Sequence, residues 1–186
     1  MAKEQHTSFT FADAAGCGNY DERPILPKGV DLQLSLSRND RPQPFHLICE
    51  HDSVLAVMAG EGRVEFKDTS VLHHRYSAGD YIYVPAGTPH RNVPESESIQ
   101  YRYKLPESEL EGIAWYCEEC GDELHRDVWE LAKELPQEGY QRACDEFNAE
   151  ESVRTCGRCE AVHPTIDTQG TRWTEVASTI RAGSGD

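Results

Sequence analysis

The stretch Gly79–His90, GDYIYVPAGTPH, combines a short apolar strand with a kinked turn that ends on a histidine. Tyr81–Val84 has the aromatic and β-branched residues of a strand, and a Gly-Asp turn precedes it. The segment Pro85–Pro89 cannot continue that strand, because its prolines and glycine favour a turn. The pattern therefore predicts that His90 begins a new strand directly after a Pro/Gly connection.

Short strands separated by turn residues run on both sides of this stretch. Leu32, Leu34 and Leu36 alternate with polar residues, which is typical of a half-buried strand. Regular short strands with frequent turns predict a mainly β sandwich or barrel over residues 31–110. The other candidate strands are Phe45–Glu50, Val54–Met58, Gly62–Phe66, Val71–Tyr76, Tyr81–Val84, His90–Val93 and Ile99–Lys104.

Three other regions flank this predicted barrel. Residues 1–30 are polar and broken by glycines and prolines, so we expect an irregular N-terminal arm. Residues 111–168 carry paired cysteines and two predicted helices, Asp127–Leu135 and Gln137–Asn148. Residues 169–186 end in Ala-Gly-Ser-Gly-Asp and are expected to form a loose tail.

Composition narrows the possible partners. The 186 residues suit one domain of ordinary size plus an appendage. The formal net charge of −15 argues against nucleic acid, since phosphate contacts need clustered Lys and Arg. The longest apolar runs are too short to cross a bilayer, and residues 1–6 lack the features of a secretory signal. We therefore expect a cytoplasmic protein with neither a nucleic-acid nor a membrane partner.

Four of the seven cysteines form two Cys-x-x-Cys pairs, Cys117/Cys120 and Cys156/Cys159. Without a secretion signal, a disulfide scaffold is disfavoured, although two disulfides are the alternative. Two such pairs can complete a tetrahedral shell of thiolates around one ion, either zinc or iron. A closed shell leaves no open position for a substrate, so we expect a structural metal site.

Gly79–His90 resembles the second cupin motif, which aims a histidine into a small barrel. The first cupin motif, His-x-His-x-x-x-Glu before a glycine turn, corresponds here to residues 46–62. Strand side chains alternate, so if His46 faces inward, Glu50 and Asp52 share its side and His51 points away. His46, Asp52 and His90 would then form a two-histidine, one-carboxylate set of the kind that holds Fe(II).

A second way of matching the first motif counts backwards from Gly60. It puts Ser53 at the glutamate position and Leu47 at a histidine position. A one-residue bulge would reconcile the two countings. Without the bulge, Glu50 and His51 could serve as substitute ligands, or the barrel holds no metal.

Over roughly residues 30–165, the chain resembles the bacterial 3-hydroxyanthranilate 3,4-dioxygenases. Besides Gly79–His90, the resemblance rests on Trp115-Tyr116-Cys117-x-x-Cys120-Gly121 with His125-Arg126, and on Cys156-x-x-Cys159 with Val162-His163-Pro164. It implies a cupin (jelly-roll) barrel followed by a rubredoxin-like four-Cys metal appendage. It also implies a barrel Fe(II) held by His, Glu and His, and a homodimer.

The residues that bind substrate in this family differ in this chain. The family has an arginine shortly before the first ligand histidine, and the nearest candidate here is Arg41, one position away. A second family arginine falls at Pro94, with Arg91 nearby. A family glutamate falls near Arg102, which could pair with an anionic substrate. Arg41 and Arg102 are therefore the candidate catalytic residues.

Three functions are compatible with these residues. The first is an Fe(II) cupin dioxygenase that uses O₂ to open the ring of a small aminophenol-type aromatic. The second is a metal-dependent oxidation of another small molecule, suggested by the altered arginines. The third is a non-enzymatic binding protein that has lost the barrel iron, suggested by Ser53 at the glutamate position.

Overall fold

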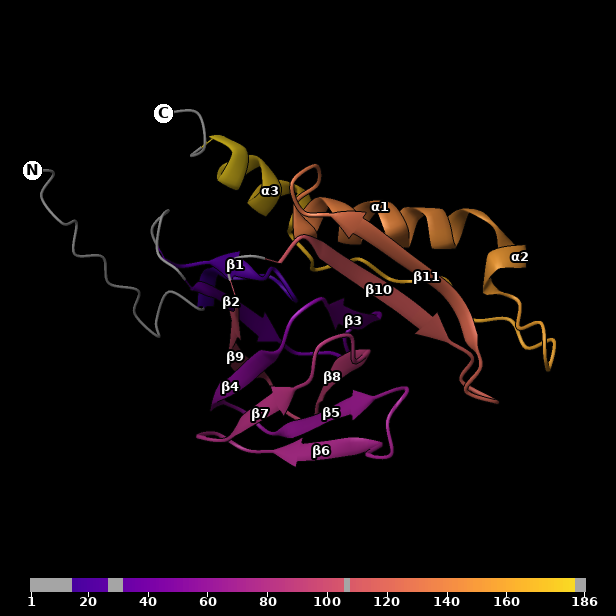
Figure 1. Ribbon diagram of the computed structural model, residues 1–186, viewed down its shortest axis with the longest axis horizontal. Helices are drawn as coiled ribbons and strands as arrows, with labels where there is room; N and C mark the ends of the chain where they lie inside the picture. Colours follow the sequence, from indigo (N-terminus) through magenta and orange to yellow (C-terminus); the bar gives the residue numbers. More distant parts are fainter. Residues whose placement is uncertain (1–14, 27–31, 106–107, 183–186) are drawn as a thin grey trace, which may run out of the picture.

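A computed structural model describes residues 15–26, 32–105 and 108–182 of the chain (Figure 1). Two sheets form its β-structure, one of five strands in the order β1-β2-β9-β4-β7 and one of six in the order β11-β10-β3-β8-β5-β6. The parts of the predicted arm and tail at residues 1–14, 27–31 and 183–186 lie outside the described residues. The strands are β1 (Arg23–Pro24), β2 (Gln33–Asn39), β3 (His46–Cys49), β4 (Ser53–Ala59), β5 (Gly62–Phe66), β6 (His73–Tyr76), β7 (Tyr81–Val84), β8 (His90–Pro94), β9 (Ser98–Lys104), β10 (Leu110–Tyr116) and β11 (Glu123–Glu130).

The strands between residues 33 and 104 confirm the predicted mainly β barrel. Alternation on β4 shows how its interior is filled: Ser53, Leu55 and Val57 are buried, whereas Met58 is 47% exposed. β9 lies between β2 and β4, and its Arg102 is directly paired with Ser35 on one side and with Leu55 on the other. Paired residues present side chains to the same side of a sheet, so Arg102 faces the interior with Leu55.

Residues 123–130 form strand β11, not part of the predicted helix Asp127–Leu135. β11 pairs with β10 along its whole length, and β10 was not predicted as a strand. Trp129 is buried and Val128 is 50% exposed, which is the period of a strand. The helical spacing of Val128, Leu131 and Leu135 was misleading because short apolar runs do not separate helix from strand.

Three helices follow the strands: α1 (Pro136–Ala149), α2 (Glu151–Arg154) and α3 (Trp173–Ala182). α1 matches the predicted helix, and Pro136 begins it with the Glu138 carboxylate accepting from the Leu135 backbone N–H at 2.8 Å. α3 occupies most of the expected tail. Its buried Trp173, Val176 and Ala177 have helical spacing, and Trp173 Nε1 donates to the Tyr20 carbonyl at 2.8 Å.

An aromatic core joins the helices to the second sheet. α1 runs along β10 and β11 (Figure 1), and Trp115 stacks on Phe147 with ring centroids 4.2 Å apart. Phe45 from the barrel lies 5.0 Å from the ring of Tyr140 and 5.9 Å from that of Trp173. The β3 side of the barrel and the helical layer therefore share one hydrophobic cluster, while the strands around β4 and β5 pack in a separate cluster.

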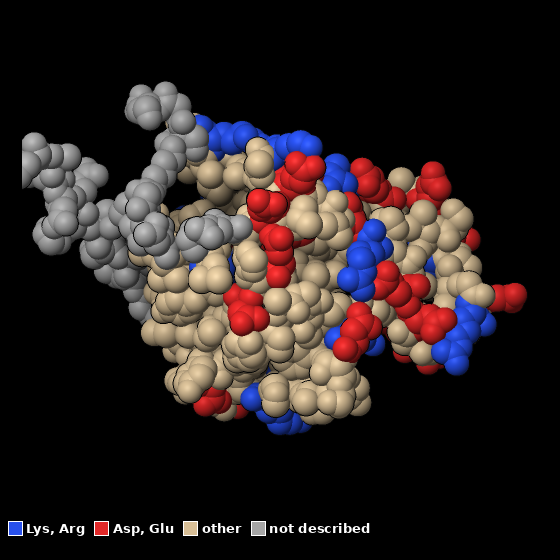
Figure 2. All heavy atoms as spheres, viewed as in Figure 1, with Lys and Arg blue, Asp and Glu red and all other residues tan. Residues whose placement is uncertain are grey.

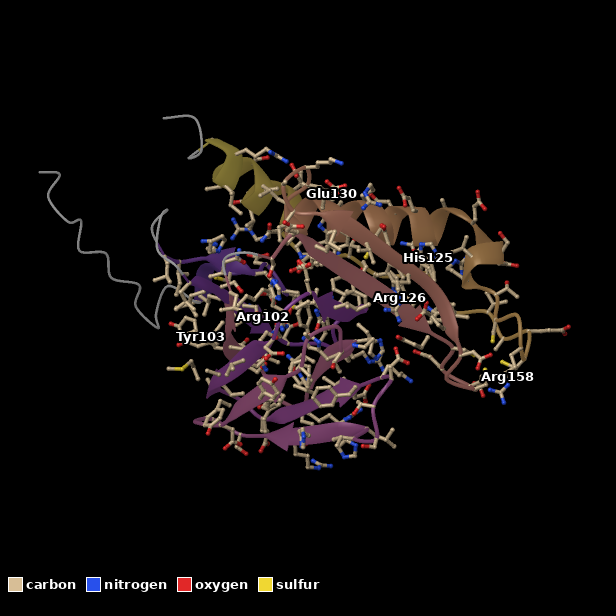
Figure 3. All side chains as sticks on the ribbon, in the orientation of Figure 1. Arg102, Tyr103, His125, Arg126, Glu130 and Arg158 are labelled. Carbon is tan, nitrogen blue, oxygen red and sulfur yellow. The ribbon has the colours of Figure 1, made fainter. Side chains whose placement is uncertain are left out.

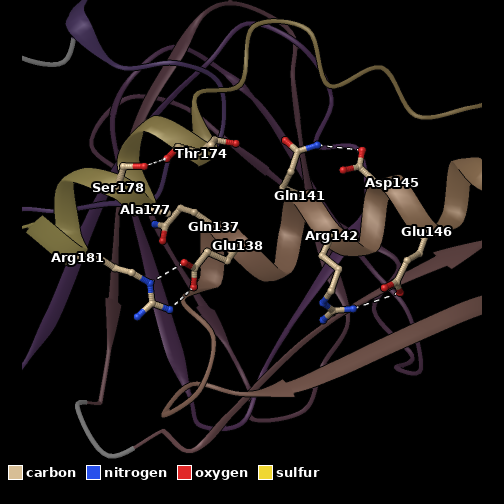
Figure 4. A pocket seen from close by; sticks show the side chains of 10 residues that line it. All are labelled: Gln137, Glu138, Gln141, Arg142, Asp145, Glu146, Thr174, Ala177, Ser178 and Arg181. Carbon is tan, nitrogen blue, oxygen red and sulfur yellow. Dashed lines mark hydrogen bonds and ion pairs between the residues drawn. The ribbon is translucent and has the colours of Figure 1, made fainter.

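The surface groove between α1 and α3 is lined largely by polar and charged side chains that satisfy one another (Figure 4). Arg181 pairs with Glu138 across the two helices, and Arg142 pairs with Glu146 within α1 at 3.2 Å. On the face seen in Figure 2, charged side chains gather over the helical half, while the barrel half shows few. Among the described residues, none of the helices is long and apolar enough to span a membrane.

We predict that Gly139→Ala destabilises the protein, although alanine favours a helix interior by about 1 kcal/mol over glycine. A Cβ at this position would overlap the indole ring of Trp129, which is held in the core. Overpacking of this kind costs about 1–3 kcal/mol, so the net change in unfolding free energy is a loss. Denaturant unfolding measures this change in unfolding free energy. The control is Ala149→Gly at an exposed position of the same helix, where the substitution changes helix propensity without changing core packing. A stabilised Gly139→Ala protein would contradict the packing described here.

Candidate functional site

His90 and Arg102 meet inside the barrel. His90 begins β8, is fully buried, and its Nδ1 lies 2.9 Å from the Thr88 carbonyl oxygen. Its Nε2 lies 2.7 Å from Nη1 of Arg102, and a guanidinium can only donate, so the imidazole accepts at Nε2. Burial and the Arg102 cation hold the pKa of His90 well below its usual range. The ring is therefore neutral, and its metal-binding nitrogen is already engaged.

Glu22, from the N-terminal segment, neutralises Arg102. Nε of Arg102 lies 3.3 Å from Oε1 of Glu22, and both side chains are almost fully buried. The Ser35 hydroxyl donates to the other carboxylate oxygen of Glu22. Burial alone would raise the pKa of Glu22, but Arg102 and Lys104 outweigh it and the pKa is lowered. The carboxylate therefore stays ionised at neutral pH.

A second ion pair lies beside the first. Lys104 on β9 pairs with Glu111 on β10, and the Tyr140 hydroxyl from α1 donates to the same carboxylate. Burial lowers the pKa of Lys104, but Glu111 outweighs this effect, so the pKa is raised. The barrel interior thus contains two cations and two carboxylates that neutralise each other.

The register of β3 decides which side chain faces His90. Leu47 is directly paired with His90, so these two side chains share the interior side and His46 points to the opposite side. There the His46 ring lies edge-on to Tyr116, with centroids 4.9 Å apart. Its Nε2 is buried and has no hydrogen-bond partner among the described residues. Burial, with a contribution from Arg91, lowers the pKa of His46 to about 3.

The other predicted barrel residues lie in surface turns. Asp52 is exposed, and its carboxylate accepts from the Ala86 backbone N–H at 2.8 Å. Glu50 accepts from the Leu110 N–H at 2.9 Å, and the half-buried His51 follows it in the same turn. Arg41 is exposed and donates to the Gln169 carbonyl at 3.0 Å. The structure does not bring His46 and Asp52 together with His90; Arg102 is the predicted residue that contacts it.

The interior residues do not fit an iron site of the His-Glu-His kind. The counting from Gly60 assigns ligand positions to Leu47 and Ser53, and both side chains face inward in the structure. Leucine offers no donor atom and serine offers no carboxylate. The Ser53 hydroxyl is buried without a hydrogen-bond partner among the described residues. Of the two-histidine, one-carboxylate set, His90 alone is in place, with a cation at its Nε2.

The four paired cysteines come together at the far end of the β10–β11 hairpin, beside the labelled Arg158 (Figure 3). Their sulfur atoms lie within 4.8 Å of one another, and Sγ atoms are 3.5 Å apart in the pairs Cys117/Cys159 and Cys120/Cys156. A tetrahedral zinc–thiolate shell needs sulfur separations of about 3.8 Å. This arrangement can therefore hold one metal ion.

Two matching backbone turns build this site. Gly121 N–H donates to the Cys117 carbonyl, and Glu160 N–H donates to the Cys156 carbonyl, both at 2.9 Å. Gly121 and Glu160 both have positive φ, so each turn places one residue in the left-handed conformation, a glycine in the first and a glutamate in the second. The backbone N–H groups of Cys159 and Arg158 lower the pKa of Cys156 to about 7. Its thiolate, the form that binds metal, is therefore substantially populated at neutral pH.

Comparison with known proteins identifies the relatives. No protein-family model matches the chain. The 3-hydroxyanthranilate 3,4-dioxygenase of Jannaschia sp. (strain CCS1) is 32% identical over 132 residues, which are 68% of this chain and 66% of that protein. The chain is a homologue of the 3-hydroxyanthranilate 3,4-dioxygenases. This agrees with the resemblance found from the sequence motifs.

Coverage of these dioxygenases is partial. The enzyme of that name from Bacillus thuringiensis (strain Al Hakam) is 31% identical over 88 residues, so the chain spans 48% of its length. A solved cupin-2 domain protein from Shewanella frigidimarina NCIMB 400 matches with a TM-score of 0.44 at 21% identity, covering 52% of this chain and 93% of that one. The fold is a cupin barrel, and the dioxygenase names belong to the relatives.

Glu22 is the site residue that sequence reasoning missed. It lies in the irregular arm, far along the chain from Arg102, and no spacing rule connects them. The alternation of Arg102 and Lys104 with Tyr101 and Tyr103 predicts the opposite, with the tyrosines buried and the cations exposed. In the structure the tyrosine side is partly exposed and the two cations are buried, so each requires a carboxylate partner.

We predict that in His46→Phe the free energy of unfolding falls less steeply as the pH drops from 7 to 4. With a folded pKa of about 3 against 6.5 unfolded, His46 takes up a proton only on unfolding as pH falls between these values. That uptake lowers the free energy of unfolding by up to about 1.4 kcal/mol per pH unit, and the loss disappears about one pH unit above 6.5. Denaturant unfolding from pH 7 to 4 measures it, and His51→Gln in the surface turn is the control. Equal slopes for the parent and His46→Phe proteins would show that His46 protonates freely in the folded state.

Proposed function

We propose that this protein is a binding member of the dioxygenase family, which takes a small aromatic molecule into its cupin barrel without Fe(II)-dependent ring opening. A structural metal ion, zinc or iron, at the four cysteines completes the protein. The observation that carries the proposal is the pairing of Leu47 with His90, which leaves one histidine where the family uses two histidines and a glutamate. The aromatic class of ligand follows from the relatives named for 3-hydroxyanthranilate.

The charges inside the barrel support the same conclusion. A divalent cation beside His90 would stand next to the Arg102 guanidinium, which is bonded to the same nitrogen that would bind the ion. Like charges at this separation in a poorly solvated interior repel strongly. The Arg102–Glu22 pair therefore disfavours a divalent ion beside His90.

The second candidate is the ring-opening dioxygenase itself, favoured by the names of the relatives. It requires iron in the barrel. Measurement of the metal in the protein separates the two candidates directly.

We expect one metal ion per chain in anaerobically purified protein, and the same content in His90→Ala, because the four cysteines supply the site. Elemental analysis measures it, with Cys156→Ser as the matched control that loses the ion. When the protein has been incubated with Fe(II) and is mixed with 3-hydroxyanthranilate in air, we expect no absorbance change from ring opening. Calorimetric titration of the protein with the same compound under argon should show binding.

Two metals per chain, falling to one in His90→Ala, would establish the dioxygenase candidate. Neither binding nor turnover of 3-hydroxyanthranilate, with one metal per chain, would exclude this ligand. Either result leaves the cupin fold and the four-cysteine site unaffected.

We further propose that two copies associate through the outer face of the first sheet. Leu34, Tyr103, Val54 and Tyr83 form one cross-strand row over β2, β9, β4 and β7. Tyr81 and Tyr83 are 76% and 54% exposed, and this row has no charged side chain. In a chain with net charge −15, this uncharged row offers two copies a contact surface, with the Asp52 carboxylate bonded to Tyr83 at its edge.

Tyr83→Glu should convert a dimer into a monomer, because a two-fold contact would oppose the new carboxylates. Light scattering measures the mass, expected near twice the 20.9 kDa chain for the parent and near one chain for the variant. Leu72→Glu, at an exposed apolar residue before β6, is the matched control and should remain dimeric. A monomeric parent protein would refute the association.

A further inference from the structure

We infer that the Arg102 guanidinium takes the place of the barrel metal ion, with Glu22 from the N-terminal segment as its counter-charge. This inference rests on the proposed function and deepens it, since it names what replaced the ion. A metal ion in the barrel would bind His90 through Nε2. Nε2 of His90 is the only nitrogen of that ring left free by its contact with Thr88, and it accepts from Arg102 Nη1 at 2.7 Å.

The side chains at the two expected ligand positions agree with the replacement of a metal ion by the Arg102 guanidinium. Leu47 and Ser53 are neutral, so these two positions supply no carboxylate to balance a divalent ion. A fixed cation of a single charge then needs one carboxylate, and Glu22 provides it at 3.3 Å. The exchange keeps a positive charge beside His90 and preserves electrical balance in the interior.

The segment that carries Glu22 is held in place at a cost. Tyr20 and Glu22 both have positive φ, at 53° and 45°, which non-glycine residues rarely adopt. Nε2 of Gln137 on α1 donates to the carbonyls of both Asp21 and Glu22, each at 3.0 Å. The strained backbone is thus fixed from the helical layer, so that one side chain can reach Arg102.

The ion pair explains why Arg102 stays at this position. Burial of a guanidinium without a partner is costly, and removal of one member of a buried pair leaves the other uncompensated. The Glu22 carboxylate also accepts from Ser35, which leaves it little freedom to bind an added ion. A metal entering the barrel would have to displace both the guanidinium and its partner.

The test restores the missing ligands with and without the ion pair. Leu47→His/Ser53→Glu keeps Arg102 and Glu22, and the matched protein adds Arg102→Met/Glu22→Gln. Each is incubated anaerobically with Fe²⁺, desalted and subjected to elemental analysis, with the four-cysteine ion as the internal reference. We expect one metal per chain with the ion pair present and two without it. A second ion in the protein that keeps Arg102, or a folded four-fold variant that stays at one, would overturn the inference.

A second measurement does not depend on refolding a remodelled barrel. Arg102→Met and Glu22→Gln are compared singly and together in the otherwise native chain by thermal unfolding. We expect the double variant to melt at a higher temperature than Arg102→Met, because no unpaired carboxylate remains. Additive shifts would overturn the inference. Two metals in the unmodified chain, lost in His90→Ala, would instead overturn the proposed function itself.

Discussion

The buried pair of Arg102 and Glu22 is the constraint on which the arrangement of this protein depends. It joins the N-terminal segment to the centre of the barrel, and Gln137 extends the connection to α1. A charge buried this deeply has few acceptable positions, so the chain that carries Glu22 must follow one path. The aromatic core around Phe45, Tyr140 and Trp173 then closes over that path.

Two features that the dioxygenase resemblance implies are present in this structure. The Pro/Gly turn before His90 still delivers a buried imidazole to the interior, and the paired cysteines still meet. At the positions where the resemblance implies further iron ligands, the interior carries Leu47 and Ser53, and Arg102 contacts His90. The fold depends on hydrophobic alternation and turns, whereas an iron site depends on a few donor atoms that single substitutions remove.

Much of this structure could be predicted from the sequence, for reasons that differ between elements. The alternation of apolar and polar residues, with turn residues between them, locates the barrel strands. The two Cys-x-x-Cys pairs indicate that the four cysteines meet at one site. The register of β3 could not be obtained in this way, because shifting the motif by one residue exchanges His46 for Leu47. Cross-strand pairing with His90 decides between them, and pairing is a long-range property. Strand β11 was mistaken for a helix for a different reason, because the spacing of its few apolar residues fits a helix as well as a strand.

The insertion of Glu22 also has a consequence for the order in which the chain folds. Its contacts reach Arg102 and Gln137, which are 80 and 115 residues away, so none can form until the barrel and α1 exist. Contacts of such long range slow folding, and a charged side chain has no reason to enter an unfinished interior. We therefore expect the segment to pair with β2 early and the Glu22 side chain to reach Arg102 and Gln137 only late in folding.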